Sequence, residues 1–174
     1  MKKYLIAIFA LATLFASCNG GQNKKDINKS NNNTNTMNTQ SDETMKIAMA
    51  YMDAMGKGDM ETMVSLMHDD MVWQNEGDKN MPWIGPWKGK KTILEDFMPL
   101  FGGNFKTTKW ETEDAFANGD TAAFFGRMVG LATKSNQETK EFSWALRVKV
   151  KDGKIILWNW FEDSFEVSRA YHNR

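Results

Sequence analysis

Apolar residues in the first half of residues 41–174 recur three or four positions apart, a spacing typical of amphipathic helices. A first helix follows the capping segment Ser41-Asp42-Glu43 and ends at Gly56 and Gly58, and a second begins after Asp59. The three apolar stripes are Met45, Ala48, Met49, Met52 and Met55, then Met60, Met63, Val64 and Met67, then Ile93, Leu94, Phe97, Met98 and Phe101.

Beyond Phe105 the apolar period changes from helical spacing to two, which predicts strands. Turn signals at Asn118-Gly119, Ser135-Asn136 and Asp152-Gly153 divide this region into four strands. One short strand, 71–75, and a loop, 76–90, lie between the second and third helices. Helices followed by an antiparallel meander predict an α+β fold with the helices on one face of a sheet.

The last two strands suggest a site, if a two-residue turn at Asp152-Gly153 sets their register. An unbroken ladder then gives one apolar face two polar members, Asn159 and Asp163. A carboxylate there would have a raised pKa and suit acid–base chemistry; alternatively, Asp163 is a solvated strand end that caps the next turn. The opposite face would carry Trp158 and Trp160, which predicts a homodimer through the sheet.

The N-terminus predicts export. Residues 1–17 combine two lysines, a short apolar run and small residues, as secretory signal peptides do. The segment Phe15-Ala16-Ser17-Cys18 resembles the lipobox of bacterial lipoproteins, which implies lipidation of Cys18 and anchoring to the cell envelope, at the outer membrane on its periplasmic or surface side. An ordinary secreted protein is the alternative. Residues 18–40 are polar and predict a disordered tether, which leaves 41–174 as one domain.

The amino-acid composition restricts the kinds of molecule that the protein is expected to bind. Without Lys2 and Lys3 the chain has 20 basic and 22 acidic residues, so no basic field would attract nucleic acid. The 13 methionines are interpreted as core rather than soft-metal ligands. Neither His68 nor His172 has the spacing of a zinc site, and we expect no metal or other cofactor. The seven tryptophans fit either core packing or an apolar pocket, with Trp83 and Trp87 as a lid.

Four stretches together resemble the SnoaL-like branch of the nuclear transport factor 2-like superfamily. They are Gly58-Asp59 through His68-Asp69-Asp70-Met71-Val72-Trp73, then Gly85-Pro86-Trp87-Lys88-Gly89-Lys90, Lys151-Asp152-Gly153-Lys154-Ile155 and Trp160-Phe161-Glu162-Asp163. The resemblance implies a curved antiparallel sheet wrapped around three N-terminal helices, forming a cone with an apolar pocket.

The same resemblance implies roles for single residues. Tyr51 has the spacing of the oxyanion donor of ketosteroid isomerases, but Asn75 stands where their catalytic aspartate would be, which argues against steroid isomerisation. The acid–base aspartates of SnoaL-like cyclases correspond to Asp163 and Asp69. The pocket is expected to be lined by Trp73, Asn75, Trp83, Trp87, Trp144, Asn159 and Phe161.

Two functions follow. The favoured one is a membrane-tethered exported domain that binds a small apolar ligand in a conical pocket. The alternative is an enzyme of the cyclase, isomerase or hydratase type that uses Asp163 as general acid or base, with Tyr51 or Asn159 stabilising developing charge.

Overall fold

The computed structural model describes the backbone of residues 24–174 and the side chains of residues 36–174. The predicted signal peptide and Cys18 lie outside the described residues. The elements are α1 (Lys24–Lys57), α2 (Met60–Leu66), β1 (Met67–Asn75), β2 (Gly85–Lys88), α3 (Lys90–Thr92), a π-helical turn (Ile93–Phe97), α4 (Met98–Asn104), β3 (Phe105–Asn118), β4 (Thr121–Ala132), β5 (Gln137–Glu138), β6 (Phe142–Lys151), β7 (Lys154–Glu162) and α5 (Ser164–His172).

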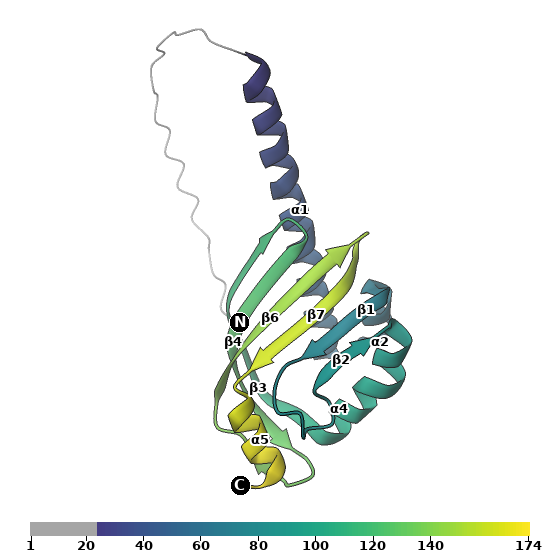
Figure 1. The fold of residues 1–174 in the computed structure, drawn as a ribbon, viewed down its shortest axis with the longest axis vertical. Helices are drawn as coiled ribbons and strands as arrows, with labels where there is room; N and C mark the ends of the chain where they lie inside the picture. Colours follow the sequence, from purple (N-terminus) through teal and green to yellow (C-terminus); the bar gives the residue numbers. More distant parts are fainter. Residues whose placement is uncertain (1–23) are drawn as a thin grey trace, which may run out of the picture.

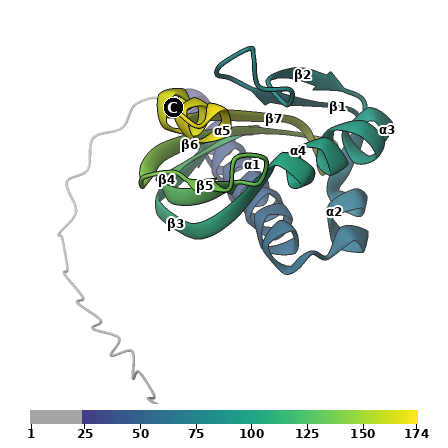
Figure 2. The ribbon, with the colours of Figure 1, turned by 90° about the horizontal axis from the view of Figure 1, so that it is seen from below.

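One curled sheet carries the fold, in the strand order β2-β1-β7-β6-β4-β3, with β5 beside β4. β1 runs parallel to β7, and the other pairs are antiparallel. Figure 1 shows the long strands β3, β4, β6 and β7 side by side, and Figure 2 shows the sheet curling from β1 round to β3 with α1 and α4 on its inner side. The predicted α+β class is therefore confirmed.

Helix α1 is longer than the sequence pattern predicts, because it begins at Lys24 instead of after Ser41. No glycine or proline stands between Gln22 and Met55 to break it. The structure thus differs from the predicted disordered tether over residues 24–40, and Ser41 does not cap a helix. Its hydroxyl accepts from the Gly119 N–H (2.9 Å) and donates to the Met37 carbonyl (2.8 Å), which ties α1 to the β3–β4 turn. No helix in the described part of the chain is long and apolar enough to cross a membrane.

The β6–β7 hairpin contains a bulge that changes the predicted faces. Asp152 and Gly153 form the expected turn, both with positive φ (51° and 72°), and Val150 pairs with Ile155. The next pair is Lys149 with Leu157, so Ile156 has no partner in the ladder. Because one extra residue reverses which face each later residue occupies, the predicted register is wrong beyond the bulge.

The reversal brings large side chains into the core. Trp158 pairs with Val148, Trp160 with Leu146 and Glu162 with Trp144, all on the concave face. Trp158 is 1% exposed, so it cannot contribute to an outer dimer surface. The tryptophan pair on which the predicted homodimer depended is therefore not on the outer face.

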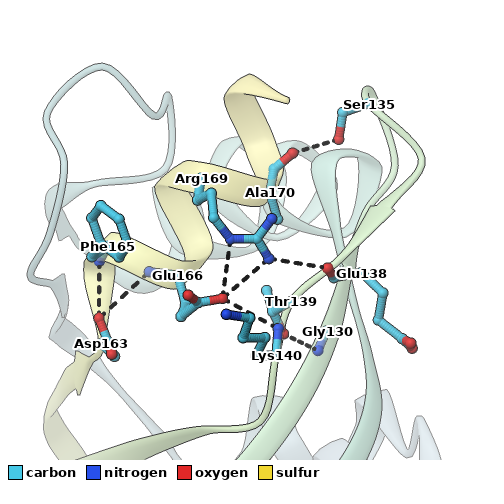
Figure 3. Close-up of polar contacts among 10 residues, drawn as sticks. All are labelled: Gly130, Ser135, Glu138, Thr139, Lys140, Asp163, Phe165, Glu166, Arg169 and Ala170. Carbon is cyan, nitrogen blue, oxygen red and sulfur yellow. Dashed lines mark hydrogen bonds and ion pairs between the residues drawn. The ribbon is translucent and has the colours of Figure 1, made fainter. Parts of the chain in front are cut away.

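The C-terminal helix α5 was not predicted and closes one end of the cone (Figure 1). Asp163 begins it: Oδ1 accepts from the N–H groups of Phe165 (3.1 Å) and Glu166 (3.4 Å). Figure 3 shows this cap and the contacts that join α5 to the segment after β4, including Ser135 donating to the Ala170 carbonyl at 2.6 Å.

Candidate functional site

An apolar cavity of about 90 Å³ lies between the concave face of the sheet and the helices. Most of its wall is aromatic: Trp73, Trp83, Phe97, Phe101, Phe105, Trp110, Trp158 and Trp160. The remaining lining residues are Met55, Asn75, Thr107, Met128 and Glu162. A mostly apolar wall with a few polar groups is typical of small-molecule sites.

Packed aromatic rings hold the wall in place. The Trp73 ring lies 4.9 Å from Phe97 and 5.3 Å from Trp158, measured between centroids. Trp83 is 1% exposed and meets Phe101 edge-on at 5.9 Å. These contacts fix the shape of the cavity before any ligand arrives.

Three nearly parallel tryptophans form a stack beside the cavity. Trp144 lies 4.2 Å from Trp110 and 5.2 Å from Trp160, again between ring centroids. Gly126 makes room for this stack, because a Cβ there would lie 2.7 Å from the Trp144 ring and 2.0 Å from the Glu111 carbonyl oxygen. The curl of the sheet explains how Trp110 on β3 reaches Trp160 on β7 (Figure 2).

Glu162 brings a carboxyl group to this apolar wall. Its Oε2 accepts from the Trp160 indole N–H at 2.7 Å, while its Oε1 is buried with no hydrogen-bond partner among residues 36–174. Burial raises the pKa of Glu162 to about 7; the charge of Asp163 adds to the rise and the Trp160 hydrogen bond opposes it. Near neutral pH the group can therefore either donate or accept a proton.

Asn75 is the second polar group of the wall. It is 4% exposed, its Oδ1 accepts from the Trp73 indole N–H at 2.9 Å, and its Nδ2 donates weakly to the Trp83 carbonyl at 3.4 Å. These partners orient the amide. An amide cannot act as a base, in agreement with the argument against steroid isomerisation.

Tyr51 is buried near the cavity but does not line it. Its ring packs 5.0 Å from Trp158, and its hydroxyl is buried without a partner in the described part of the chain. Burial raises the pKa of Tyr51, so the phenol stays protonated.

Both aspartates suggested by the resemblance lie outside the cavity. Asp163 is exposed and caps α5 (Figure 3), because the bulge gives its expected position to Glu162. The Asp69 side chain is 89% exposed and lies 3.9 Å from Lys90 Nζ. The structure therefore offers neither carboxylate to a ligand in the cavity.

The bulge also removes two predicted ligand-binding residues from the pocket. Phe161 is 41% exposed on the outer face. Asn159 is buried there, with its Oδ1 accepting from Arg147 Nη2 at 2.9 Å.

The other expected pocket residues lie on the concave side. Trp73, Asn75 and Trp83 line the cavity, and Trp144 supports it through the tryptophan stack. Trp87 packs behind Phe97, 5.6 Å between centroids, and donates to the Trp83 carbonyl. Trp83 is thus a fixed wall, and the two residues do not form a separate lid.

The loop that carries Trp83 is held against α5 through Asp78. Asp78 Oδ2 accepts from the Ser168 hydroxyl at 2.5 Å and lies 3.3 Å from His172 Nε2. The Ser168 hydrogen bond, together with those from Asn80, lowers the pKa of Asp78 to about 2.

The sequence did not single out Glu162, and it offered Trp110 only as one of seven tryptophans that fit either core packing or a pocket. Glu162 is adjacent to the predicted Asp163, and the bulge alone decides which of the two faces the cavity. Trp110 is itself 42% exposed, on a strand whose side chains are mostly exposed, and no local signal shows that this strand curls over the cavity.

The family model described as "SnoaL-like domain" matches residues 48–158. The chain belongs to this family. No curated protein matches it. Solved structures show the same fold at low identity. An NTF2-like protein from Burkholderia xenovorans LB400 has a TM-score of 0.67 and 21% identity, over 75% of this chain and 97% of that one.

Two further solved structures share this fold. One is an LEH-like epoxide hydrolase from M. tuberculosis, with a TM-score of 0.58 and 17% identity over 76% of this chain and 92% of that one. The other is TerC co-crystallised with polyporic acid, with a TM-score of 0.64 and 16% identity over 75% of this chain and 98% of that one.

Proposed function

We propose that this SnoaL-like domain binds a small apolar molecule in the cavity, with one polar contact at Glu162. The observation that carries this proposal is a cavity of about 90 Å³ with aromatic walls, also lined by Glu162, whose Oε1 is buried with no hydrogen-bond partner among the described residues. A buried polar atom without a partner costs about 1–3 kcal/mol, and a ligand that bonds to it recovers that energy. The TerC structure, which contains polyporic acid, supports the idea that this fold accommodates organic ligands.

Two probes test the proposal through the protonation state of Glu162. Below pH 7 its carboxyl is mostly neutral; because Oε2 accepts from Trp160, the proton resides on Oε1 and can be donated to 2-butanone. Above pH 7 the carboxylate can only accept, so 2-butanone binding weakens while 1-butanol, which can donate, still binds. The measurement is tryptophan fluorescence of the full chain in cholate, titrated with each probe at pH 5.5 and pH 8.5.

Matched variants assign the effect to one carboxyl. Glu162→Gln keeps the shape and can donate at either pH, so 2-butanone binding becomes independent of pH. Asp163→Asn removes the neighbouring exposed charge, which adds to the rise of the Glu162 pKa, so it should keep the pH dependence of 2-butanone binding and move its midpoint to lower pH. The absence of a saturable response to both probes would refute the binding function.

A second candidate is an enzyme in which Glu162, rather than Asp163, is the general acid or base. The supporting observation is its raised pKa of about 7, close to the value that favours proton transfer at neutral pH. The likeness to an epoxide hydrolase makes hydration of a small epoxide the reaction to test. If Glu162 activates water, turnover of 1,2-epoxybutane rises as pH passes through 7, and Glu162→Gln abolishes turnover while 1-butanol still binds. Turnover unchanged in Glu162→Gln would exclude this mechanism.

For location, we propose export and anchoring to the bacterial envelope through a lipid on Cys18. The support is the sequence of residues 1–18. On this proposal, α1 connects the anchor to the cone.

A further inference from the structure

A side groove opens beside the cavity, between α1 and β3. Its volume is about 450 Å³, and it is lined by Met52, Met55, Gly56, Thr107, Trp110 and Trp158. Four of these residues, Met55, Thr107, Trp110 and Trp158, also line the cavity. The two spaces are therefore direct neighbours.

The size of the cavity restricts the shape of that ligand. A dry cavity of roughly 150 Å³ is known to accept a benzene ring. The cavity here, at about 90 Å³, is smaller. An unbranched alkyl chain is narrower than a ring and fits a cavity of this size, whereas a flat polycyclic molecule is too large for it.

The chemistry of the lining restricts the ligand further. Glu162 Oε1 needs a hydrogen-bonding partner, and none is available within the described residues. A charged ligand group would lose its hydration among aromatic walls, which is costly without a paired charge. A hydroxyl head group carries no charge and can either donate to or accept from the Glu162 carboxyl, so it meets both conditions. Met52 and Met55 in the groove are unbranched and flexible, so they adapt to an alkyl chain.

We propose that the cavity and the side groove bind one amphiphile, whose hydroxyl head bonds to Glu162 and whose unbranched alkyl chain leaves through the groove. This inference rests on the proposed binding function and specifies its ligand class.

Binding of a series of 1-alkanols tests the proposal. The full chain is kept in cholate, a rigid fused-ring detergent wider than the cavity, and tryptophan fluorescence gives the Kd for 1-butanol, 1-hexanol, 1-decanol and cyclohexanol. Each added methylene that is buried should lower Kd about fourfold. 1-Hexanol should bind at least about tenfold more tightly than cyclohexanol, which has the same number of carbons but is too wide.

A glycine in the groove provides a blocking variant. A Cβ built on Gly56 meets nothing within 4 Å, so Gly56→Phe can fill the groove without disturbing the core. It should leave the Kd of 1-butanol within about twofold and weaken 1-decanol by at least about tenfold. Gly102→Phe, at an equally open position on α4, and Gly56→Ala should both match wild type.

The outcomes separate the two proposals. Two results would overturn the inference and leave the binding function standing. One is that Gly56→Phe, shown to be folded by circular dichroism, binds longer alkanols more tightly to the same extent as wild type. The other is that cyclohexanol and 1-hexanol have the same Kd. If no alcohol binds at all, the binding function itself fails.

Discussion

Glu162 and Asp163 are adjacent carboxylates in very different environments. Glu162 faces the tryptophans of the cavity, and burial raises its pKa to about 7. Asp163 is exposed, and its carboxylate accepts from two backbone N–H groups at the start of α5. The first is suited to chemistry with a ligand and the second to holding the C-terminal helix.

The raised pKa predicts how stability depends on pH. The folded state holds the Glu162 proton more tightly than the unfolded state, where the pKa is near 4.5. Ionisation therefore costs stability as pH rises from about 4.5 through 7, on the order of 3 kcal/mol once complete. Glu162→Gln removes this cost, so its stability relative to wild type should increase over that range. Urea unfolding at pH 4.5, 6 and 8 measures the difference.

The exposed neighbour provides the contrasting variant. Asp163→Ala removes the helix cap and should cost about 1 kcal/mol of unfolding free energy, while 1-butanol affinity stays unchanged. If Asp163→Ala loses more ligand binding than Glu162→Gln does, the ligand contacts Asp163 and the assignment of the site to Glu162 is wrong.

Two glycines of β4 decide how closely the elements around the cavity can approach. A Cβ on Gly126 would meet the Glu111 backbone oxygen at 2.0 Å, and a Cβ on Gly130 would meet the Phe105 ring at 2.1 Å. The first obstacle is backbone and the second is a side chain. β4 thus accepts a side chain at Gly130 only if Phe105 moves.

Alanine substitutions test this difference. Gly126→Ala should destabilise the domain by at least about 3 kcal/mol, because two strands must separate. Gly130→Ala should cost about 1–3 kcal/mol, and Phe105→Leu should recover part of that loss. Gly102→Ala, in an open helical position, should instead gain about 0.5–1 kcal/mol. Thermal unfolding of the four variants gives the comparison, and equal losses at Gly126 and Gly130 would contradict it.

At the scale of the whole molecule, α1 links the cone to the N-terminal segment. It packs on the sheet through its second half and, in Figure 1, projects beyond the β3–β4 turn through its first half. On the proposed anchoring, this projection would space the cavity from the bilayer surface.

The anchor itself is testable, because Cys18 is the single cysteine of the chain. Cys18→Ser should abolish incorporation of labelled palmitate in bacterial cells, whereas Ser17→Ala should retain it. Labelled Cys18→Ser protein would show that the lipid is attached elsewhere.

The sequence by itself determined the class of fold and the places where the chain turns. Helical and strand periods are local, and the turns at Asn118-Gly119, Ser135-Asn136 and Asp152-Gly153 depend on residues that tolerate positive φ, so all were predictable. The aromatic character of the cavity wall also followed from Trp73, Trp83 and the resemblance.

Only the tertiary structure decided which residues face the cavity. Ile155-Ile156-Leu157-Trp158 is continuously apolar, so its sequence contains no alternation that would reveal the bulge at Ile156. Packing selected the register that buries Trp158 and brings Trp160 and Glu162 inward. In the same way, the approach of Trp110 depends on the curl of the whole sheet, a property of many strands together that no single segment encodes.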